Sequence, residues 1–173
     1  MLKIYLTLFI VSLAAVIDLR IRRIPNVLTM PAIAFGIILN TYNSGLGGGV
    51  NALAGFTSGI LVLLIPFILG GMGAGDVKLL AAIGALNGTQ FVLQASLYSA
   101  LSGGVIALIV AAARGQLGLV TFNTYMAVQS FSIYKILKKD FEPTGFLSSN
   151  IRFPYGMAIL AGTIITYLMG WAL

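Results

Sequence analysis

Long runs of apolar residues are the feature that most limits how this chain can fold. Residues 2–17, 50–69 and 91–113 carry a single charged side chain, that of Lys3. A helix that crosses a bilayer needs about 20 mostly apolar residues. Only 8% of the 173 residues are charged, against about 25% in an ordinary soluble domain. The sequence therefore predicts an all-α integral membrane protein with about six transmembrane helices in one domain, residues 1–173.

Turn residues and glycines divide the chain into these six helices. The spacing predicts helices over residues 2–17, 27–40, 50–69, 76–86, 91–113 and 153–173. Pro25 separates the first two, and residues 41–49 predict a flexible turn. Gly55 and Gly59 form a small-xxx-small face that favours close helix packing. Residues 114–152 predict a cytoplasmic or interfacial loop, with an amphipathic helix over residues 121–139.

The first apolar run has a second interpretation, a signal peptide. Lys3 precedes the apolar core, and residues 12–14 resemble a small-x-small cleavage site. The basic cluster that follows, residues 18–23, is typical of a cytoplasmic anchor. We therefore prefer a first transmembrane helix.

The basic residues predict an orientation in the membrane. Of the 10 Lys and Arg residues, only Lys3 lies on one side of the six-helix arrangement, and all the others fall on the first, third and fifth connections. Loops rich in Lys and Arg stay in the cytoplasm, so both termini are expected on the non-cytoplasmic side. The net charge of +6 does not indicate nucleic acid, because no basic stripe with interleaved aromatic residues is present.

Cysteine and histidine are both absent. Their absence excludes thiol nucleophiles, Cys/His zinc sites and a histidine general base. Any catalysis must use Asp, Glu, Lys, Ser, Thr or Tyr, and we expect no cofactor and no metal ion.

Two of the four acidic residues fall at the same predicted depth. Asp18 closes the first helix and Asp76 opens the fourth, both on the predicted cytoplasmic side. Carboxylates at the edge of the hydrocarbon are costly and indicate function. As a pair they can share a proton and carry out acid–base catalysis. Alternatively, Asp18 forms an ion pair with neighbouring arginines, and Asp76 pairs with Lys78 or caps its helix.

Glycines precede the second aspartate. Gly73 and Gly75 remove side chains, which allows unusual backbone torsions and close approach of another chain. A flexible loop or a tight helix contact explains the same glycines.

Taken together, these stretches resemble the type IV prepilin peptidase family, the GxGD aspartic membrane proteases. The resemblance rests on GAGDVK (residues 73–78) followed by LLAAIGA, on DLRIRRIPN (residues 18–26) and on PYGMA (residues 154–158). These pieces stand in the family's order and cover nearly the whole chain. The chain is most similar to the short members that serve Tad/Flp-type pili or archaeal class III signal peptides.

The resemblance implies an endopeptidase that cuts the basic leader from prepilins, pseudopilins or preflagellin-like proteins at the cytoplasmic face of the inner membrane. It places Asp18 and Asp76 on the catalytic positions. It gives Gly73, Gly75, Lys78, Pro154, Tyr155 and Gly156 supporting or substrate-binding roles. Longer family members carry an extension with paired cysteines associated with methyl transfer, which makes methyltransferase activity doubtful here.

Two other functions fit the same residues. A small transporter or channel could use Asp18 and Asp76 as proton or ion ligands, although the two halves of the chain show no convincing repeat. A non-catalytic subunit could hold pilins through helix packing. Cleavage of a prepilin that depends on both aspartates separates the protease from these alternatives.

Overall fold

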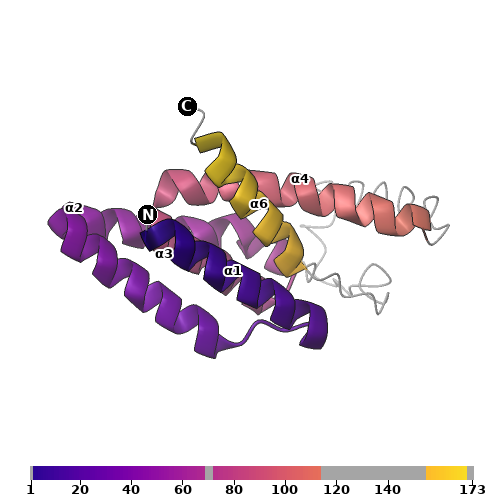
Figure 1. Cartoon of the computed structure of the whole chain (residues 1–173), viewed down its shortest axis with the longest axis horizontal. Coiled ribbons are helices and arrows are strands. Elements are labelled where there is room, and N and C mark those ends of the chain that lie inside the picture. Colours follow the sequence, from indigo (N-terminus) through magenta and orange to yellow (C-terminus); the bar gives the residue numbers. More distant parts are fainter. Residues whose placement is uncertain (1, 69–71, 114–154, 171–173) are drawn as a thin grey trace, which may run out of the picture. The chain divides into compact units, whose positions relative to one another are not determined.

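A computed structural model describes residues 2–68, 72–113 and 155–170, and the described elements are all helices (Figure 1). The chain divides into two compact units, Met1–Gly103 with Pro154–Leu173, and Gly104–Phe153. The first unit holds most of the described residues. Of the second unit, only residues 104–113 are described, and they continue helix α4. The expected single domain stays a prediction.

Helix α1 (Leu2–Ile21) runs past its predicted end at residue 17 and includes Asp18. It ends where Arg22 adopts a left-handed conformation, with φ 53°. The Arg22 N–H donates to the carbonyl oxygen of Asp18 at 2.8 Å. This is the αL arrangement that closes helices, although glycine usually occupies that position. Residues 22–25 then form a short non-helical connection before α2, so the break predicted at Pro25 is confirmed.

Helix α2 (Asn26–Ile68) covers the second and third predicted helices. Only Ser44 and Gly45 interrupt it, and Gly45 has a φ of 63°. The flexible turn predicted over residues 41–49 was therefore too long. Thr41 remains helical and its hydroxyl donates to the carbonyl oxygen of Ile37 at 2.8 Å. One glycine with positive φ is enough to redirect the chain.

Helix α3 (Ala74–Asn87) is buried along almost its whole length, from Asp76 to Leu86. Glycines of α2 lie directly against its backbone. A Cβ added at Gly59 would lie 2.7 Å from the carbonyl oxygen of Leu80, and one at Gly36 would lie 2.8 Å from the carbonyl carbon of Ala85. Gly55 meets Gly84 in the same way. The close packing predicted for Gly55 and Gly59 is confirmed.

Helix α4 (Thr89–Ala113) follows after Gly88, and α6 (Tyr155–Gly170) is the last described helix. The two run antiparallel within the first unit. The rings of Phe91 and Tyr167 lie 4.5 Å apart at one end, and Gly103 faces Tyr155 at the other. Of the predicted last helix, residues 153–154 and 171–173 lie outside the described residues. So do the loop over residues 114–152 and its amphipathic helix.

The helix directions define two ends of the first unit. We call the end with Asp18, Asp76 and Gly156 the acidic end, and the opposite end the Lys3 end. Helices α1 and α6 pack against each other, and α2 packs extensively on α3 (Figure 1). The polypeptide passes from one end to the other along α1, each half of α2, α3, α4 and α6. This alternation agrees with an up-and-down membrane bundle.

Side-chain amides of Asn40 and Asn87 join the helices at the Lys3 end. The Asn40 amide donates to the carbonyl oxygens of Ala85 and Leu86 at 2.9 and 3.0 Å, and it accepts from Lys3 at 2.6 Å. The Asn87 amide donates to the Thr7 hydroxyl at 2.9 Å and accepts from the Tyr167 hydroxyl at 2.7 Å. The bonds from Asn40 satisfy backbone carbonyls that the end of α3 leaves without helical partners. They fasten that end of α3 to α1, α2 and α6.

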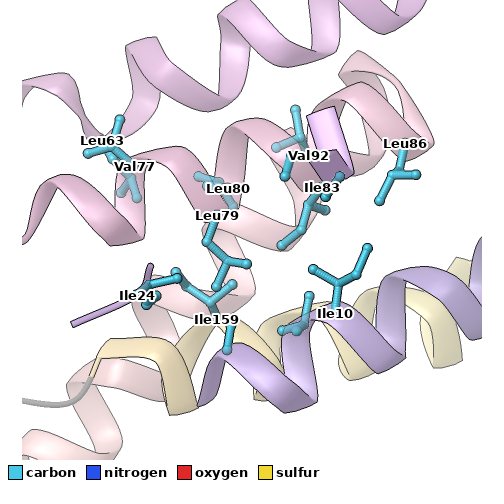
Figure 2. Packing of buried hydrophobic residues seen from close by; sticks show 14 residues of the cluster. Ile10, Ile24, Leu63, Val77, Leu79, Leu80, Ile83, Leu86, Val92 and Ile159 are labelled. Atoms are coloured by element: carbon cyan, nitrogen blue, oxygen red, sulfur yellow. The ribbon is translucent and has the colours of Figure 1, made fainter. Parts of the chain in front are cut away.

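The apolar core surrounds α3. Figure 2 shows Leu79, Leu80 and Ile83 of α3 among side chains from the other helices, including Ile10 of α1 and Ile159 of α6. All five residues are at most 7% exposed. Many outward-facing side chains on α1, α2 and α4 are large and apolar, as expected where lipid replaces water.

Three described helices are long and apolar enough to cross a membrane: Leu2–Ile21, Asn26–Ile68 and Thr89–Ile109. Helix α6 is apolar but shorter, with 16 residues. The prediction of an all-α membrane protein is supported at this level. The number of crossings and the side of the termini remain predictions.

The glycine contacts between α2 and α3 can be tested with Gly59→Ala. The new methyl group would meet the α3 backbone, so we expect a loss of about 1–3 kcal/mol in the free energy of unfolding. The midpoint of thermal unfolding in detergent measures the effect. Gly47→Ala is the control, because a Cβ there meets nothing within 4 Å. Equal midpoints for the two variants would contradict the close packing.

Candidate functional site

Asp18 lies in the last turn of α1 and is only 6% exposed. Its Oδ2 accepts the backbone N–H of Gly156 at 3.0 Å. Gly156 is the second residue of α6, where backbone N–H groups lack helical partners and favour a negative charge. The start of α6 therefore holds one carboxyl of the candidate pair.

Gly156 leaves little room for a side chain at this contact. A Cβ added at Gly156 would lie 3.0 Å from Oδ2 of Asp18 and 3.1 Å from its Cβ. Both distances are shorter than side chains normally tolerate. The PYGMA stretch thus places its glycine against the first aspartate, a juxtaposition across 138 positions of sequence.

Asp76 occupies the first turn of α3 and is 9% exposed. Its Oδ2 accepts the N–H of Gly73 at 3.1 Å, and its own N–H donates to the Gly73 carbonyl at 3.1 Å. This reciprocal pair caps the start of α3. The interpretation of Asp76 as a helix cap is therefore correct. The cap uses only Oδ2 of the carboxyl group.

The two aspartates share the acidic end of the first unit. Asp18 is near enough to Asp76 for their charges to interact, and Asp76 likewise interacts with Tyr155. In the described part of the chain, the hydrogen bonds of both carboxylates come from backbone N–H groups rather than from basic side chains. The structure thus gathers two buried carboxyls from α1 and α3, with the start of α6 beside them.

Of the two glycines before Asp76, Gly75 lies close to another segment, and Gly73 has ordinary backbone torsions. Gly73 has φ −83° and ψ 150°, which any residue adopts, and the expectation of special torsions there was wrong. A Cβ at Gly75 would lie 2.9 Å from the Cβ of Ile24 and 3.1 Å from its backbone nitrogen. The chain that approaches Gly75 in this structure is the connection between α1 and α2.

Lys78 bonds a neutral amide and not a carboxylate in the described part of the chain. Its ammonium donates to Oδ1 of Asn26 at 2.9 Å, which agrees with its expected position about 200° round the helix from Asp76. Tyr155 is half-buried, and its ring lies against Gly103 of α4. Pro154 lies outside the described residues.

Sequence reasoning missed the contacts of Ile24 and Asn26. Both stand in the DLRIRRIPN stretch, which predicted a helix break but no role for these side chains. Only the fold reveals that they meet α3 on either side of Asp76. Among the described residues, no three His, Cys, Asp or Glu side chains form a group that could hold a metal ion; chemistry without a metal remains a prediction.

The amino-acid sequence of this chain is similar to that of a known protein family. Residues 5–108 match the sequence model of the type IV leader peptidase family. That segment contains Asp18, Gly73, Gly75, Asp76 and Lys78, whereas Tyr155 and Gly156 lie beyond it. No solved structure shows a significant match.

Individual relatives give the same result. The chain is 29% identical over 170 residues to a prepilin leader peptidase/N-methyltransferase of Bacillus subtilis, covering 96% of this chain and 54% of the relative. It is 33% identical over 139 residues to the protein of that name from Xanthomonas campestris, covering 76% and 48%. The Neisseria gonorrhoeae protein is 34% identical over 122 residues, covering 64% and 41%. This chain spans about half the length of these relatives.

The contact between α6 and Asp18 can be tested with Gly156→Ala. The added methyl group must displace either the carboxyl of Asp18 or the start of α6, so we expect a loss of about 1–3 kcal/mol in unfolding free energy. Thermal unfolding in detergent measures it. Gly170→Ala on the same helix is the control, because nothing lies within 4 Å of its added Cβ. A wild-type midpoint for Gly156→Ala would show that this contact is loose.

Proposed function

Because this chain belongs to the type IV leader peptidase family, we propose that it is a membrane aspartic endopeptidase that cleaves the short basic leader of prepilin-like proteins. The observation that carries the proposal is the placement of two buried carboxyls, Asp18 and Asp76, at the same end of the first unit. Burying two carboxyl groups from different helices at the same end costs free energy. In a peptidase without His or Cys, these carboxyl groups can serve as the catalytic acid and base.

The proposed chemistry uses the two carboxyls as a unit. Neighbouring carboxyls share one proton because both cannot ionise cheaply. The ionised member takes a proton from water while the water oxygen attacks the scissile carbonyl carbon, and the protonated member donates to the carbonyl oxygen. When the tetrahedral intermediate collapses, the aspartate that took the water proton donates it to the leaving nitrogen, and the C–N bond breaks. The other aspartate takes back a hydroxyl proton, so a carboxylic acid and an amine leave and the starting pair is restored. Either aspartate can begin as the base.

The surrounding residues have supporting roles in this proposal. Gly156 orients Asp18 through its N–H group, and Gly73 does the same for Asp76. Gly75 allows the α1–α2 connection to lie close beside Asp76. Tyr155 begins α6, Pro154 keeps the supporting role that the family resemblance gives it, and Lys78 donates to Asn26.

We place the enzyme in the inner (cytoplasmic) membrane as a six-crossing protein with both termini on the non-cytoplasmic side. Support comes from the alternating helix directions and from the charges. Arg20, Arg22, Arg23 and Lys78 belong to the acidic end, while Lys3 belongs to the other. By the positive-inside rule the acidic end faces the cytoplasm, where a basic leader is exposed.

The substrate class follows from the family. We propose prepilin, pseudopilin or preflagellin-like substrates, with membrane lipids around the helices and no nucleic acid partner. Asp140 and Glu142, in the predicted loop, are the acids available to attract a basic leader. The chain has no cysteine, and the proposal extends only to the peptidase half of its relatives' names, without methyl transfer.

The main test is cleavage of a co-expressed prepilin whose basic leader ends in Gly. Asp18→Asn and Asp76→Asn should each lower cleavage by about a hundred- to ten-thousandfold, as loss of a catalytic acid or base does. Asparagine keeps the size of the side chain and an oxygen that can accept the N–H of Gly156 or Gly73, so thermal unfolding should show that both variants still fold. Full cleavage by either variant rules out the two-aspartate mechanism. Proton or cation flux in liposomes without cleavage favours a transporter.

The pH dependence provides a second test. Cleavage should follow a bell-shaped profile, because the pair is inactive when both carboxyls are protonated and again when both are ionised. The two apparent pKa values of this profile belong to the pair of carboxyls and not to either aspartate. Chelators should leave the rate unchanged at every pH. Inhibition that is reversed when a divalent metal is restored would mean that the carboxylates hold an ion.

A further inference from the structure

The connection between α1 and α2 contacts α3 on both sides of Asp76. Ile24 is only 7% exposed although it lies outside the helices, and it packs against Gly75. Two residues further on, Asn26 accepts a hydrogen bond from Lys78 at 2.9 Å. Gly75 and Lys78 flank Asp76 in the first turns of α3. Residues 24–26 thus contact the first turns of α3, which carry Asp76, at two points.

The same connection begins at the first aspartate. The carbonyl oxygen of Asp18 accepts the N–H of Arg22 at 2.8 Å, and the left-handed Arg22 turns the chain toward Ile24. From Asp18 to Asn26 the chain therefore passes directly from one carboxyl to the turn that holds the other. Any movement of this connection relative to α3 changes the separation of the two aspartates.

We propose that Asn26 and Lys78 form a positioning clamp that fixes the separation of Asp18 and Asp76. The clamp rests on the proposed peptidase function and deepens it, because it gives Lys78 a part at that site and adds Asn26. Neither residue touches the reacting atoms. Lys78 acts through Asn26 on the connection, and the connection acts on Asp18.

The direction of the Lys78 side chain favours a clamp over a direct electrostatic role. Its hydrogen-bond partner is a neutral amide of α2 and not a carboxylate. This hydrogen bond has a charged donor but is exposed, so its net strength is modest, about 0.6–1.4 kcal/mol. Loss of the clamp should therefore cost roughly three- to tenfold in rate, far less than loss of either aspartate.

A double-mutant cycle on prepilin cleavage tests the clamp. Asn26→Ala and Lys78→Met should each lower kcat about three- to tenfold with KM unchanged, and the double variant should be no slower than either single variant. Independent, multiplying effects would overturn the clamp. So would a raised KM in Lys78→Met alone, because that result would place the ammonium on the substrate.

Conservative and matched variants complete the design. Asn26→Asp keeps an acceptor for Lys78 and should retain kcat near that of the wild type. Asn43→Leu removes an exposed asparagine from the opposite end of α2's first half and should have no effect. Thermal unfolding identifies any variant that fails to fold, and Asn26→Ser then replaces Asn26→Ala. Loss of activity in Asn26→Asp equal to that in Asn26→Ala would also overturn the clamp.

The pH profile supplies a readout that general destabilisation does not move. Carboxyls held close together titrate far apart, and moving them apart brings their apparent values together. Asn26→Ala and Lys78→Met should therefore each narrow the bell-shaped pH profile of cleavage. A lowered kcat with a pH profile of unchanged width would contradict the clamp but not the proposed peptidase function. Wild-type cleavage that does not depend on Asp18 and Asp76 would overturn the proposed function, and the clamp with it.

Discussion

Helix α3 can be enclosed on nearly all sides only because glycine stands wherever a neighbouring backbone approaches it. Gly36, Gly55 and Gly59 bring α2 within contact distance of the α3 main chain, and Gly75 does the same for the α1–α2 connection. In a membrane, helices gain little from hiding apolar surface, so close backbone packing supplies much of the attraction. Both ends of the first unit depend on this central helix, since it carries Asp76 at one end and Asn87 at the other.

The two ends are held in different ways. At the Lys3 end, Asn40 and Asn87 make several side-chain bonds to α1, α3 and α6. At the acidic end, the described bonds between elements are fewer: Gly156 N–H to Asp18, Lys78 to Asn26, and the Ser102 hydroxyl to the carbonyl oxygen of Ala158. Interhelical bonds in membranes contribute about 0.6 kcal/mol on average. Among the described residues, the acidic end therefore has fewer side-chain bonds between helices than the Lys3 end.

Sequence reasoning reached the helices, the break at Pro25, the glycine packing on α2 and the family, because each depends on local composition or on a short motif. It missed the continuation of α2 through Thr41, since glycine-rich stretches usually end helices and only Gly45 does so here. It could not foresee that Gly156 would bind Asp18 or that Lys78 would reach Asn26. Such contacts join distant segments and are determined by how the helices pack. The catalytic roles remain proposals.

The glycine contacts also bear on how such an interface changes over evolutionary time. Where two leucines meet, one can shrink while the other grows, and the pair leaves a correlated trace in related sequences. Gly55 and Gly84 have no side-chain volume to exchange, because each already presents only hydrogen to the other's backbone. The most intimate contact of the first unit should therefore show invariance rather than correlated change. Methods that infer contacts from covariation are expected to find α2 beside α3 through their larger, more distant side chains.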